Sequence, residues 1–372
     1  MNTLIKWPGG KAREIKHIED MIPPFDRYVE PFFGGGAMFF FLKPQVALIN
    51  DISNNLMGFY RLVKEQDKDF QNYLRGYDML MSSIVGASER KYGELNLIYN
   101  SVKKSYIDKS IARSMVSDIV KDLLIDVYRK ETFNVIEDHK LFEMFLIDMY
   151  MDKVNRTMHN ERKASFDARD LKENLITGFT NGVYMYFRYI YNRLALGTLN
   201  DKSIAYRIAN FYFIREYCYG SMFRYNKKGE FNIPYGGMSY NRKDFKSKID
   251  KIFTNDIYEL FKGTEIHSKD FADFIEEADL TDRDFMFLDP PYDTEFSDYE
   301  GLEFGKDDQK RLAEVLEQTR AKFILIIKNT ELIYSLYKDK FRVLGFDKQY
   351  TYNVRSRNER KTEHLVITNI EA

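Results

Sequence analysis

The chain of 372 residues contains a single cysteine, Cys218, and its longest apolar runs are short. A single cysteine excludes an internal disulfide. Runs such as residues 37–42 and 323–327 are far shorter than the roughly 20 apolar residues that a membrane-spanning helix needs. No basic and apolar leader begins the chain, so we expect a cytoplasmic protein with no membrane partner.

The sequence also lacks an excess of either charge, because its 56 Lys and Arg residues are balanced by 57 Asp and Glu residues. Any nucleic-acid site must therefore come from local clustering of basic residues. The five histidines are scattered, without the cysteine or carboxylate spacing of a zinc site, so we expect no metal. The length allows one or two domains with a substantial core.

Short apolar runs followed by turns or helical patterns are predicted to be buried strands. They are RYVEPF (27–32), VALIND (46–51), DFMFLDPPY (284–292), KFILIIKN (322–329) and HLVITN (364–369), with helical periodicity over 306–318 and 330–337. Strands that alternate with helices predict an α/β fold with a mostly parallel, doubly wound sheet. Ligands are then expected at the carboxyl ends of its strands.

The middle of the chain has a different character. Residues 61–204 are rich in charged residues, Tyr and Met, lack proline and are predicted to form a helical insertion. Residues 212–238 are predicted to contain a hairpin with its turn at Lys228 and Gly229. We therefore predict a discontinuous domain of residues 1–60 and 251–372, interrupted by a second domain of residues 61–250.

A glycine loop follows the first predicted strand in YVEPFFGGGAMFF (28–40). Glycines between a strand and a helix let a backbone approach a ligand closely, although a tight turn explains them equally well. The dinucleotide fingerprint is incomplete, because Phe39 stands where its third glycine would be, and no P-loop is present. Asp51 ends the next strand, where an acidic side chain accepts hydrogen bonds from ribose hydroxyls or caps a helix.

The stretch LDPPYDTEF (288–296) carries the most specific signal. An adenine N6 amine is a poor nucleophile, because its lone pair is delocalised into the ring. The Asp289 carboxylate and the Pro290 carbonyl can accept its two hydrogens and turn the lone pair toward a methyl donor. Tyr292 offers a flat face for an extruded base. A rigid strand-end turn is the competing interpretation, but chance produces this tetrapeptide in such a chain only about once in a thousand.

These motifs and their order resemble the D12, or alpha-class, amino-methyltransferases of the DNA adenine methylase (Dam) type. LIKWPGGK resembles the family's N-terminal cofactor motif, LINDISNNL its ribose-binding acid, SKDF its segment for the cofactor adenine and GEFNIPYG its DNA-contacting hairpin. The resemblance implies S-adenosylmethionine as methyl donor. The cofactor contacts that it implies are Trp7, Lys11, Glu30, Phe32, Gly34, Gly36, Asp51, Asp270, Phe271 and Asp289. It also implies a mobile loop over residues 293–305 that closes on the flipped base.

The same resemblance implies a hairpin that reads double-stranded DNA at a site containing GAT. The implied DNA contacts are Tyr219, Met222, Arg224, Asn226, Lys228 and Pro234; Tyr219 wedges into the stack, Arg224 reads a base edge and Pro234 packs on a thymine methyl. Residues 207–251 are basic as well, through Arg215, Lys227, Arg242, Lys243, Lys246 and Lys248. The insertion is about twice as long as in small family members, and the bases suggested there for backbone contacts are Lys103, Lys104, Arg113, Arg162 and Lys163.

We therefore predict a site-specific DNA methyltransferase that modifies adenine N6. A cytosine-N4 methyltransferase is the closest alternative, although related enzymes of that kind commonly carry Ser at the position of Asp289. A DNA-binding relative without catalysis is the alternative from another class, and RNA is a weaker substrate candidate. The sequence leaves open whether a cognate restriction endonuclease is a second partner.

Overall fold

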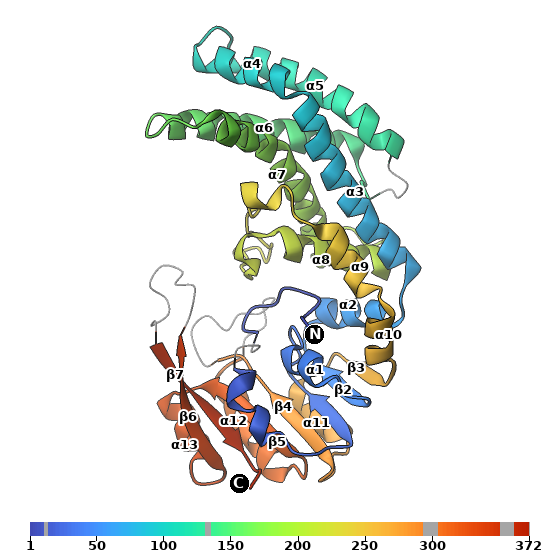
Figure 1. The fold of residues 1–372 in the computed structure, drawn as a ribbon, viewed down its shortest axis with the longest axis vertical. Helices are drawn as coiled ribbons and strands as arrows, with labels where there is room; N and C mark the ends of the chain where they lie inside the picture. The colour runs from blue at the N-terminus through green and yellow to red at the C-terminus, as the bar shows by residue number, and fades with distance from the viewer. Residues whose placement is uncertain (11–13, 131–134, 293–303, 350–360, 372) are drawn as a thin grey trace. The chain divides into compact units, whose positions relative to one another are not determined.

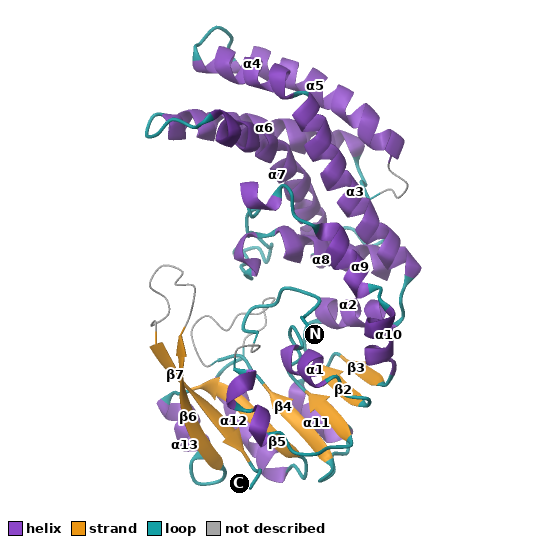
Figure 2. Ribbon diagram, in the orientation of Figure 1, coloured by secondary structure: helices purple, strands orange, loops and turns teal. Residues whose placement is uncertain are grey.

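The structure, a computed structural model, describes residues 1–10, 14–130, 135–292, 304–349 and 361–371. The chain divides into two compact units. Unit 1 comprises Met1–Glu65 and Asn255–Ala372, and unit 2 comprises Gln66–Thr254. All the named strands belong to unit 1, whereas unit 2 is mainly helical (Figure 2).

The described residues of unit 1 form a seven-stranded sheet in the order β3-β2-β1-β4-β5-β7-β6 (Figure 1). Its strands are β1 (Arg27–Glu30), β2 (Ala47–Asn50), β3 (Thr264–His267), β4 (Asp284–Leu288), β5 (Lys322–Lys328), β6 (Arg342–Gln349) and β7 (Lys361–Thr368). The first five pair in parallel, and β7 is antiparallel to both β5 and β6. The predicted mostly parallel α/β sheet is confirmed.

Helices cover both faces of this sheet. On one face, Tyr28 and Phe285 lie in a cluster of aromatic rings with residues of α1 (Ala37–Leu42), α2 (Asn54–Lys64) and α10 (Asn255–Lys262). On the other face, Val29 and Met286 pack with α11 (Phe271–Glu277), α12 (Lys306–Gln318) and α13 (Glu331–Tyr337). The short 3-10 helices η1 (Ile15–His17) and η2 (Glu19–Met21) precede β1. Burial on both faces explains why β4 is apolar from Phe285 to Leu288.

The sequence analysis did not predict two of the strands, β3 and β6. Strand β3 has the sequence Thr-Glu-Ile-His, which contains no apolar run, because three of its four residues are only partly buried or exposed. Strand β6 lies at the edge of the sheet and pairs only with β7, so its sequence tolerates Gly345 and Asp347. Both are strands that the pattern of a fully buried strand does not describe.

Unit 2 consists of α3 (Lys68–Arg90), α4 (Tyr92–Lys103), α5 (Lys109–Lys130), α6 (His139–Glu161), α7 (Ala168–Ala195), α8 (Ile204–Tyr217) and α9 (Phe245–Ile252). The 3-10 helices η3 (Tyr219–Ser221) and η4 (Met238–Tyr240) lie between α8 and α9. The predicted hairpin begins later than residue 212, because Tyr212, Phe213 and Tyr217 belong to the buried aromatic surface of α8. The chain reverses between residues 218 and 236.

None of the helices in the described part of the chain combines the length and the apolar character that a bilayer crossing requires. The same part of the chain contains no group of three or more His, Cys, Asp or Glu that could hold a metal ion.

Candidate functional site

A cavity of about 320 Å³ lies in unit 1 where the parallel strands end. Its walls come from the loops after β1, β2, β3 and β4, from the N-terminal segment and from the start of α12. The predicted site residues that line it are Trp7, Glu30, Phe32, Gly34, Gly36, Asp51, Asp270, Phe271, Asp289, Pro290 and Tyr292. Lys11 and residues 293–303 of the predicted mobile loop lie outside the described residues.

The glycine loop approaches Trp7 more closely than a side chain would allow. Gly34 and Gly36 have φ angles of 49° and 68°, in the left-handed region that glycine adopts without strain. A Cβ added at Gly34 would lie 2.9 Å from Cδ1 of Trp7, and one at Gly36 would lie 2.5 Å from Cζ of Phe33. The loop thus exposes backbone to the cavity with no side chain in the way.

Asp51 ties this loop to the helix that follows β2. Its Oδ2 accepts a hydrogen bond from the Gly34 N–H at 2.9 Å, and its Oδ1 accepts one from the Ser53 N–H at 3.0 Å. Asp51 thus has a structural role in the turn before α2, although the N-cap of that helix is Ser53.

Asn50 joins two walls of the cavity, and the sequence analysis did not identify it. Its Nδ2 donates to the carbonyls of Pro31 and Lys269, both at 3.1 Å, and its Oδ1 accepts from the Lys269 N–H at 2.9 Å. The side chain is buried, with 1% of its surface exposed. Its position directly before Asp51 at a strand end is the signal that could have pointed to it.

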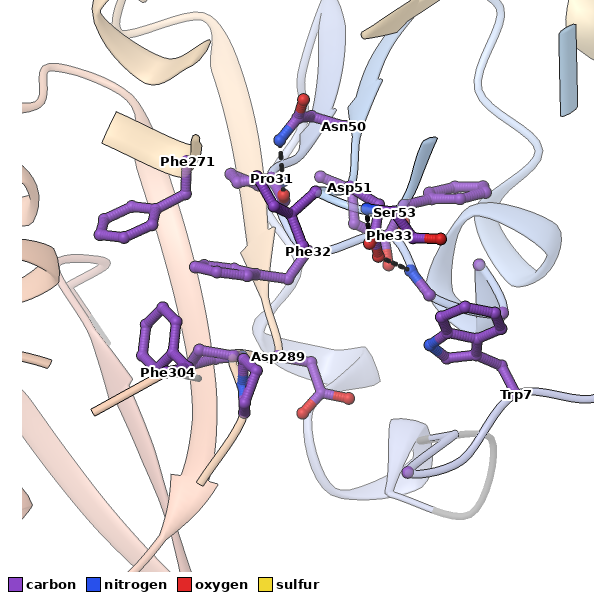
Figure 3. A pocket seen from close by; sticks show the side chains of 18 of the residues that line it. Trp7, Pro31, Phe32, Phe33, Asn50, Asp51, Ser53, Phe271, Asp289 and Phe304 are labelled. Carbon is purple, nitrogen blue, oxygen red and sulfur yellow. Dashed lines mark hydrogen bonds between the residues drawn. The ribbon is translucent and has the colours of Figure 1, made fainter. Parts of the chain in front are cut away.

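Three phenylalanines form an apolar side of the cavity. The ring centroids of Phe32, Phe271 and Phe304 lie 5.3 to 5.6 Å apart. Figure 3 shows these rings gathered on one side, Trp7 on the other and Asp289 between them. Asp270 caps α11 through the Ala272 N–H at 2.9 Å and accepts from Arg311 at 2.7 Å, so its carboxylate is held in place beside Phe271.

Glu30 and Asp289 place two carboxyl groups in a partly dry environment. Glu30 is buried, and the Tyr28 hydroxyl donates to its Oε2 at 2.8 Å. Burial raises the pKa of Glu30 well above its ordinary value, despite that hydrogen bond, and the charges of Asp289 and Asp51 raise it further. A cationic ligand in the cavity would relieve this crowding of carboxylates.

Two buried side chains support the Pro-Pro-Tyr segment after Asp289. Gln309, on α12, donates from its Nε2 to the Pro291 carbonyl at 2.9 Å and is fully buried. The ring of His364, on β7, lies edge-on to Tyr292, with centroids 5.4 Å apart and an interplanar angle of 88°. Neither residue was predicted, because both are distant from the motif in sequence.

In unit 2, the segment from Cys218 to Gly236 packs on α7. Asn192 hydrogen-bonds both the N–H and the carbonyl of Phe231, and Tyr184 and Arg188 both donate to the Ile233 carbonyl. Most of the predicted DNA contacts are left exposed as a result: Tyr219, Arg224, Asn226, Lys228 and Pro234, with Met222 half-buried. The predicted turn is present, since the Gly229 N–H donates to the Asn226 carbonyl at 2.9 Å.

Arg224 and Asn226 already have partners within this segment. Arg224 donates to the Asn232 side-chain oxygen at 2.6 Å and to its carbonyl at 3.0 Å. Asn226 bonds the Glu230 carboxylate at 2.7 Å and accepts from the Lys228 and Glu230 N–H groups, so it shapes the turn. The Asn232 contacts hold Arg224 by its Nε and Nη2 atoms.

Most of the other basic residues near the hairpin already have partners within the protein, which the sequence analysis did not anticipate. Arg215 is buried against the Phe223 ring, Lys243 and Lys248 pair with the buried Glu216, Arg242 pairs with Glu89 and Glu173, and Lys246 pairs with Asp250. Such pairs join residues up to 153 positions apart, so the local sequence does not reveal them. Lys227 and Lys228 remain exposed without an ion pair among the described residues.

The sheet and the cavity at its strand ends define an α/β methyltransferase architecture. The sequence profile of the family described as D12 class N6 adenine-specific DNA methyltransferase matches residues 7–187 and 168–352. The chain belongs to this family and is an adenine-specific DNA methyltransferase.

Individual relatives agree with this assignment. The type II methyltransferase M.CviBI of Paramecium bursaria Chlorella virus NC1A is 26% identical over 99% of this chain and 100% of its own length. The type II methyltransferase M.MjaIII of Methanocaldococcus jannaschii is 25% identical over 87% of this chain and 83% of its own. A DNA adenine methylase of Vibrio cholerae is 21% identical over 85% of this chain and 76% of its own.

Proposed function

We propose that this protein transfers a methyl group from S-adenosylmethionine to N6 of an adenine flipped out of double-stranded DNA. The observation that carries the proposal is the content of one cavity. The glycine loop and Asp51, which suit a nucleoside cofactor, line the same cavity as Asp289, Pro290 and Tyr292, which suit an exocyclic amine on a flat base.

The residues present fit this cofactor. The rings of Phe32, Phe271 and Phe304 form an apolar surface for its adenine, and a carboxylate at the end of β2, such as that of Asp51, is the kind of acceptor that suits its ribose hydroxyls. The carboxylates of Asp51 and Asp289 favour the positive charge of its sulfonium and amino groups, and that charge in turn favours ionisation of Glu30. When bound, the cofactor supplies an electrophilic methyl group.

The chain's own contribution is to activate and place the amine. The Asp289 carboxylate and the Pro290 carbonyl accept hydrogen bonds from its two N–H groups, which leaves the nitrogen lone pair directed at the methyl donor. The nitrogen loses one of these two protons when it gains the methyl group. Pro291 keeps Pro290 extended, and Gln309 fixes Pro291 through the hydrogen bond to its carbonyl. Tyr292 stacks on the extruded base, a contact of about 1 to 3 kcal/mol.

The decisive experiment incubates the full chain with DNA and cofactor carrying an isotopically labelled methyl group, followed by mass spectrometry of the nucleosides. We expect labelled N6-methyladenine from the wild type and none from Asp289→Ala with an unchanged circular dichroism spectrum. Labelled N4-methylcytosine would overturn the choice of base. Full turnover by Asp289→Ala would overturn the role of the motif.

The role of Asp51 needs a separate measurement. If it accepts the ribose hydroxyls, Asp51→Asn should weaken cofactor binding in calorimetry by about tenfold, which corresponds to roughly 1.4 kcal/mol. Ser53→Ala serves as control for loosening of this loop, because it removes the bond from the Leu56 N–H to the Ser53 hydroxyl and keeps the backbone bonds of Gly34 and Ser53 to Asp51. An unchanged affinity for Asp51→Asn would reduce Asp51 to its structural role.

We further propose that the segment from Cys218 to Gly236 reads a GAT-containing site, with Tyr219 as a wedge, Arg224 at a base edge and Pro234 on a thymine methyl. Arg224 and Pro234 are exposed, and the two Asn232 contacts hold the guanidinium by its Nε and Nη2 atoms. A bidentate contact discriminates by about 1 to 3 kcal/mol. Sequencing a methylated random oligonucleotide pool should show Arg224→Ala relaxing one position; an equal loss at every sequence would assign Arg224 to phosphate.

The type II names of several relatives make a cognate restriction endonuclease a candidate partner of this methyltransferase. If one exists, DNA methylated by the chain should resist cleavage by extracts of its natural host. Equal cleavage of methylated and unmethylated DNA would argue against such a partner.

A further inference from the structure

The helical part of unit 2 ends in two loops that lie against each other. They are the α4–α5 loop with its flanking residues, 103–110, and the α6–α7 loop with its flanking residues, 159–170; together they form the arm tip. Glu161 joins them, since its Oε2 accepts from Lys103 and from the Tyr99 hydroxyl, both at 2.5 Å. The fold thus brings together bases that are some 60 positions apart in the chain.

The carboxylates of the arm tip are largely engaged within the protein. Asp108 accepts from the N–H groups of Ser110 and Ile111 at the start of α5, and Asp167 caps α7 through the Asp170 N–H. Glu161 is paired as described above. The hydrogen bonds to its carboxylate lower the pKa of Asp108 and keep it ionised as a cap.

The cations of the arm tip face solvent. Five of them are exposed and form no ion pair among the described residues: Lys104, Lys109, Arg162, Lys163 and Arg169. Tyr106, beside Lys104, is 75% exposed. This differs from the surroundings of the hairpin, where most bases are neutralised by buried or facing carboxylates.

Helix α7 connects the arm tip to the hairpin as one continuous helix. It begins at Ala168, next to the tip, and it fixes the hairpin through Tyr184, Arg188 and Asn192. Twenty residues separate Ala168 from Arg188, which corresponds to about 30 Å at 1.5 Å per residue. That length equals about 9 base pairs of duplex DNA at 3.4 Å each. In Figure 1, the α6–α7 loop and the loops beside α8 extend to the same side of this unit.

We propose that the arm tip binds the phosphate backbone of the DNA duplex outside the recognised site, about 9 base pairs from the bases that the hairpin contacts. The inference rests on the proposed function, because it takes the hairpin as the reader of the site. Exposed lysines and arginines with no carboxylate partner are the groups that neutralise phosphates without reading sequence. The enlarged insertion then contributes affinity, and the hairpin contributes specificity.

The test compares two duplexes that carry one target site each, taken from the methylation map of the wild type. The short duplex extends about 5 base pairs on either side of the site, and the long one about 20, so that only the long one reaches the arm tip. The variant is the triple substitution Lys109→Gln, Arg162→Gln and Lys163→Gln. The control changes the same net charge elsewhere in unit 2, through Lys68→Gln, Lys121→Gln and Lys140→Gln, all exposed.

Fluorescence anisotropy over a series of salt concentrations gives the Kd and its salt dependence. For the arm-tip variant on the long duplex, we expect the Kd to rise about tenfold or more at 0.1 M salt and the salt slope to fall by about 2 to 3. Its Kd on the short duplex, which also reports that it is folded, should match the wild type. The control variant should match the wild type on both.

Three results would overturn the inference: an unchanged Kd of the arm-tip variant on the long duplex, equal losses on both duplexes, or an equal loss in the control variant. An unchanged Kd would leave a protein partner as the candidate for this surface. The proposed function fails in a different way, namely when the wild type produces no N6-methyladenine in any DNA.

Discussion

Asn50 offers the sharpest test of how unit 1 holds its cavity together. Replacing it with alanine removes three hydrogen bonds to Pro31 and Lys269, which belong to the loops after β1 and β3. The first loop carries Phe32, and the second leads into α11, which begins at Phe271. The substitution should therefore weaken both the fold of unit 1 and the cofactor site, without touching any group that is proposed to meet the ligand directly.

The magnitude follows from burial. The side chain is 1% exposed, so alanine leaves two carbonyls and one N–H group without their partners in a poorly hydrated place. Each such group costs about 1 to 3 kcal/mol, and water entering from the adjoining cavity recovers part of this. We expect unit 1 to lose about 2 to 4 kcal/mol of stability in urea unfolding, and cofactor affinity to fall about tenfold in calorimetry.

Asn369 provides a matched control in the same unit. Its side chain also bonds two backbone groups, the Phe323 N–H and the Ala321 carbonyl, both at 2.9 Å, but it is exposed. Water can replace these bonds, so Asn369→Ala should cost about 1 kcal/mol or less. If Asn50→Ala costs no more than Asn369→Ala, burial of the Asn50 hydrogen bonds is not what stabilises the loops, and the reasoning is refuted.

Three further outcomes are expected. Gly36→Ala should lower the Tm of unit 1 by the equivalent of about 2 kcal/mol or more, because the new Cβ would meet the Phe33 ring at 2.5 Å and φ is 68°; an unchanged Tm would contradict this. Burial opposes ionisation of Asp284, but hydrogen bonds from Arg27 outweigh it and lower the pKa of Asp284. The ionised Asp284 therefore stabilises the fold above about pH 4, and this stabilisation is lost as the pH falls. Asp284→Asn should make the stability of the protein less dependent on pH in acid than that of the wild type. Gln309→Leu should reduce single-turnover methylation about tenfold, with cofactor affinity unchanged, since it frees the Pro291 carbonyl; an equal fall in cofactor affinity would assign Gln309 to general packing.

The parts of the site that the sequence predicted are those encoded by short contiguous stretches. The glycine loop, Asp51 and Asp289 each follow an apolar strand, and parallel strands must bring such strand ends to one edge of the sheet, whereas Trp7 was implied by the family resemblance. That geometric rule is why motifs separated by more than 200 residues could be placed in one cavity before the fold was seen.

The parts that could not be predicted depend on contacts between distant segments. Gln309 and His364 support the catalytic motif from α12 and β7, and nothing in their neighbouring residues distinguishes them from other core positions. For the basic residues around the hairpin, the sequence likewise shows no sign of the distant carboxylates that pair with them. Arg242 appeared available to DNA until the fold placed Glu89 and Glu173 beside it.

The net charge of −1 is the sum of a basic unit 2 and an acidic unit 1, and these opposite charges suit the functions proposed for the two units. Unit 2 contains 31 Lys and Arg against 24 Asp and Glu, a net charge of +7, whereas unit 1 contains 25 against 33, a net charge of −8. A polyanion is attracted to the first and repelled by the second, while a cationic cofactor favours the second. An acidic catalytic unit gains from this arrangement only if the basic unit supplies the attraction for DNA. The exposed bases of unit 2 must then attract the DNA, and these bases are few at the hairpin and are gathered at the arm tip.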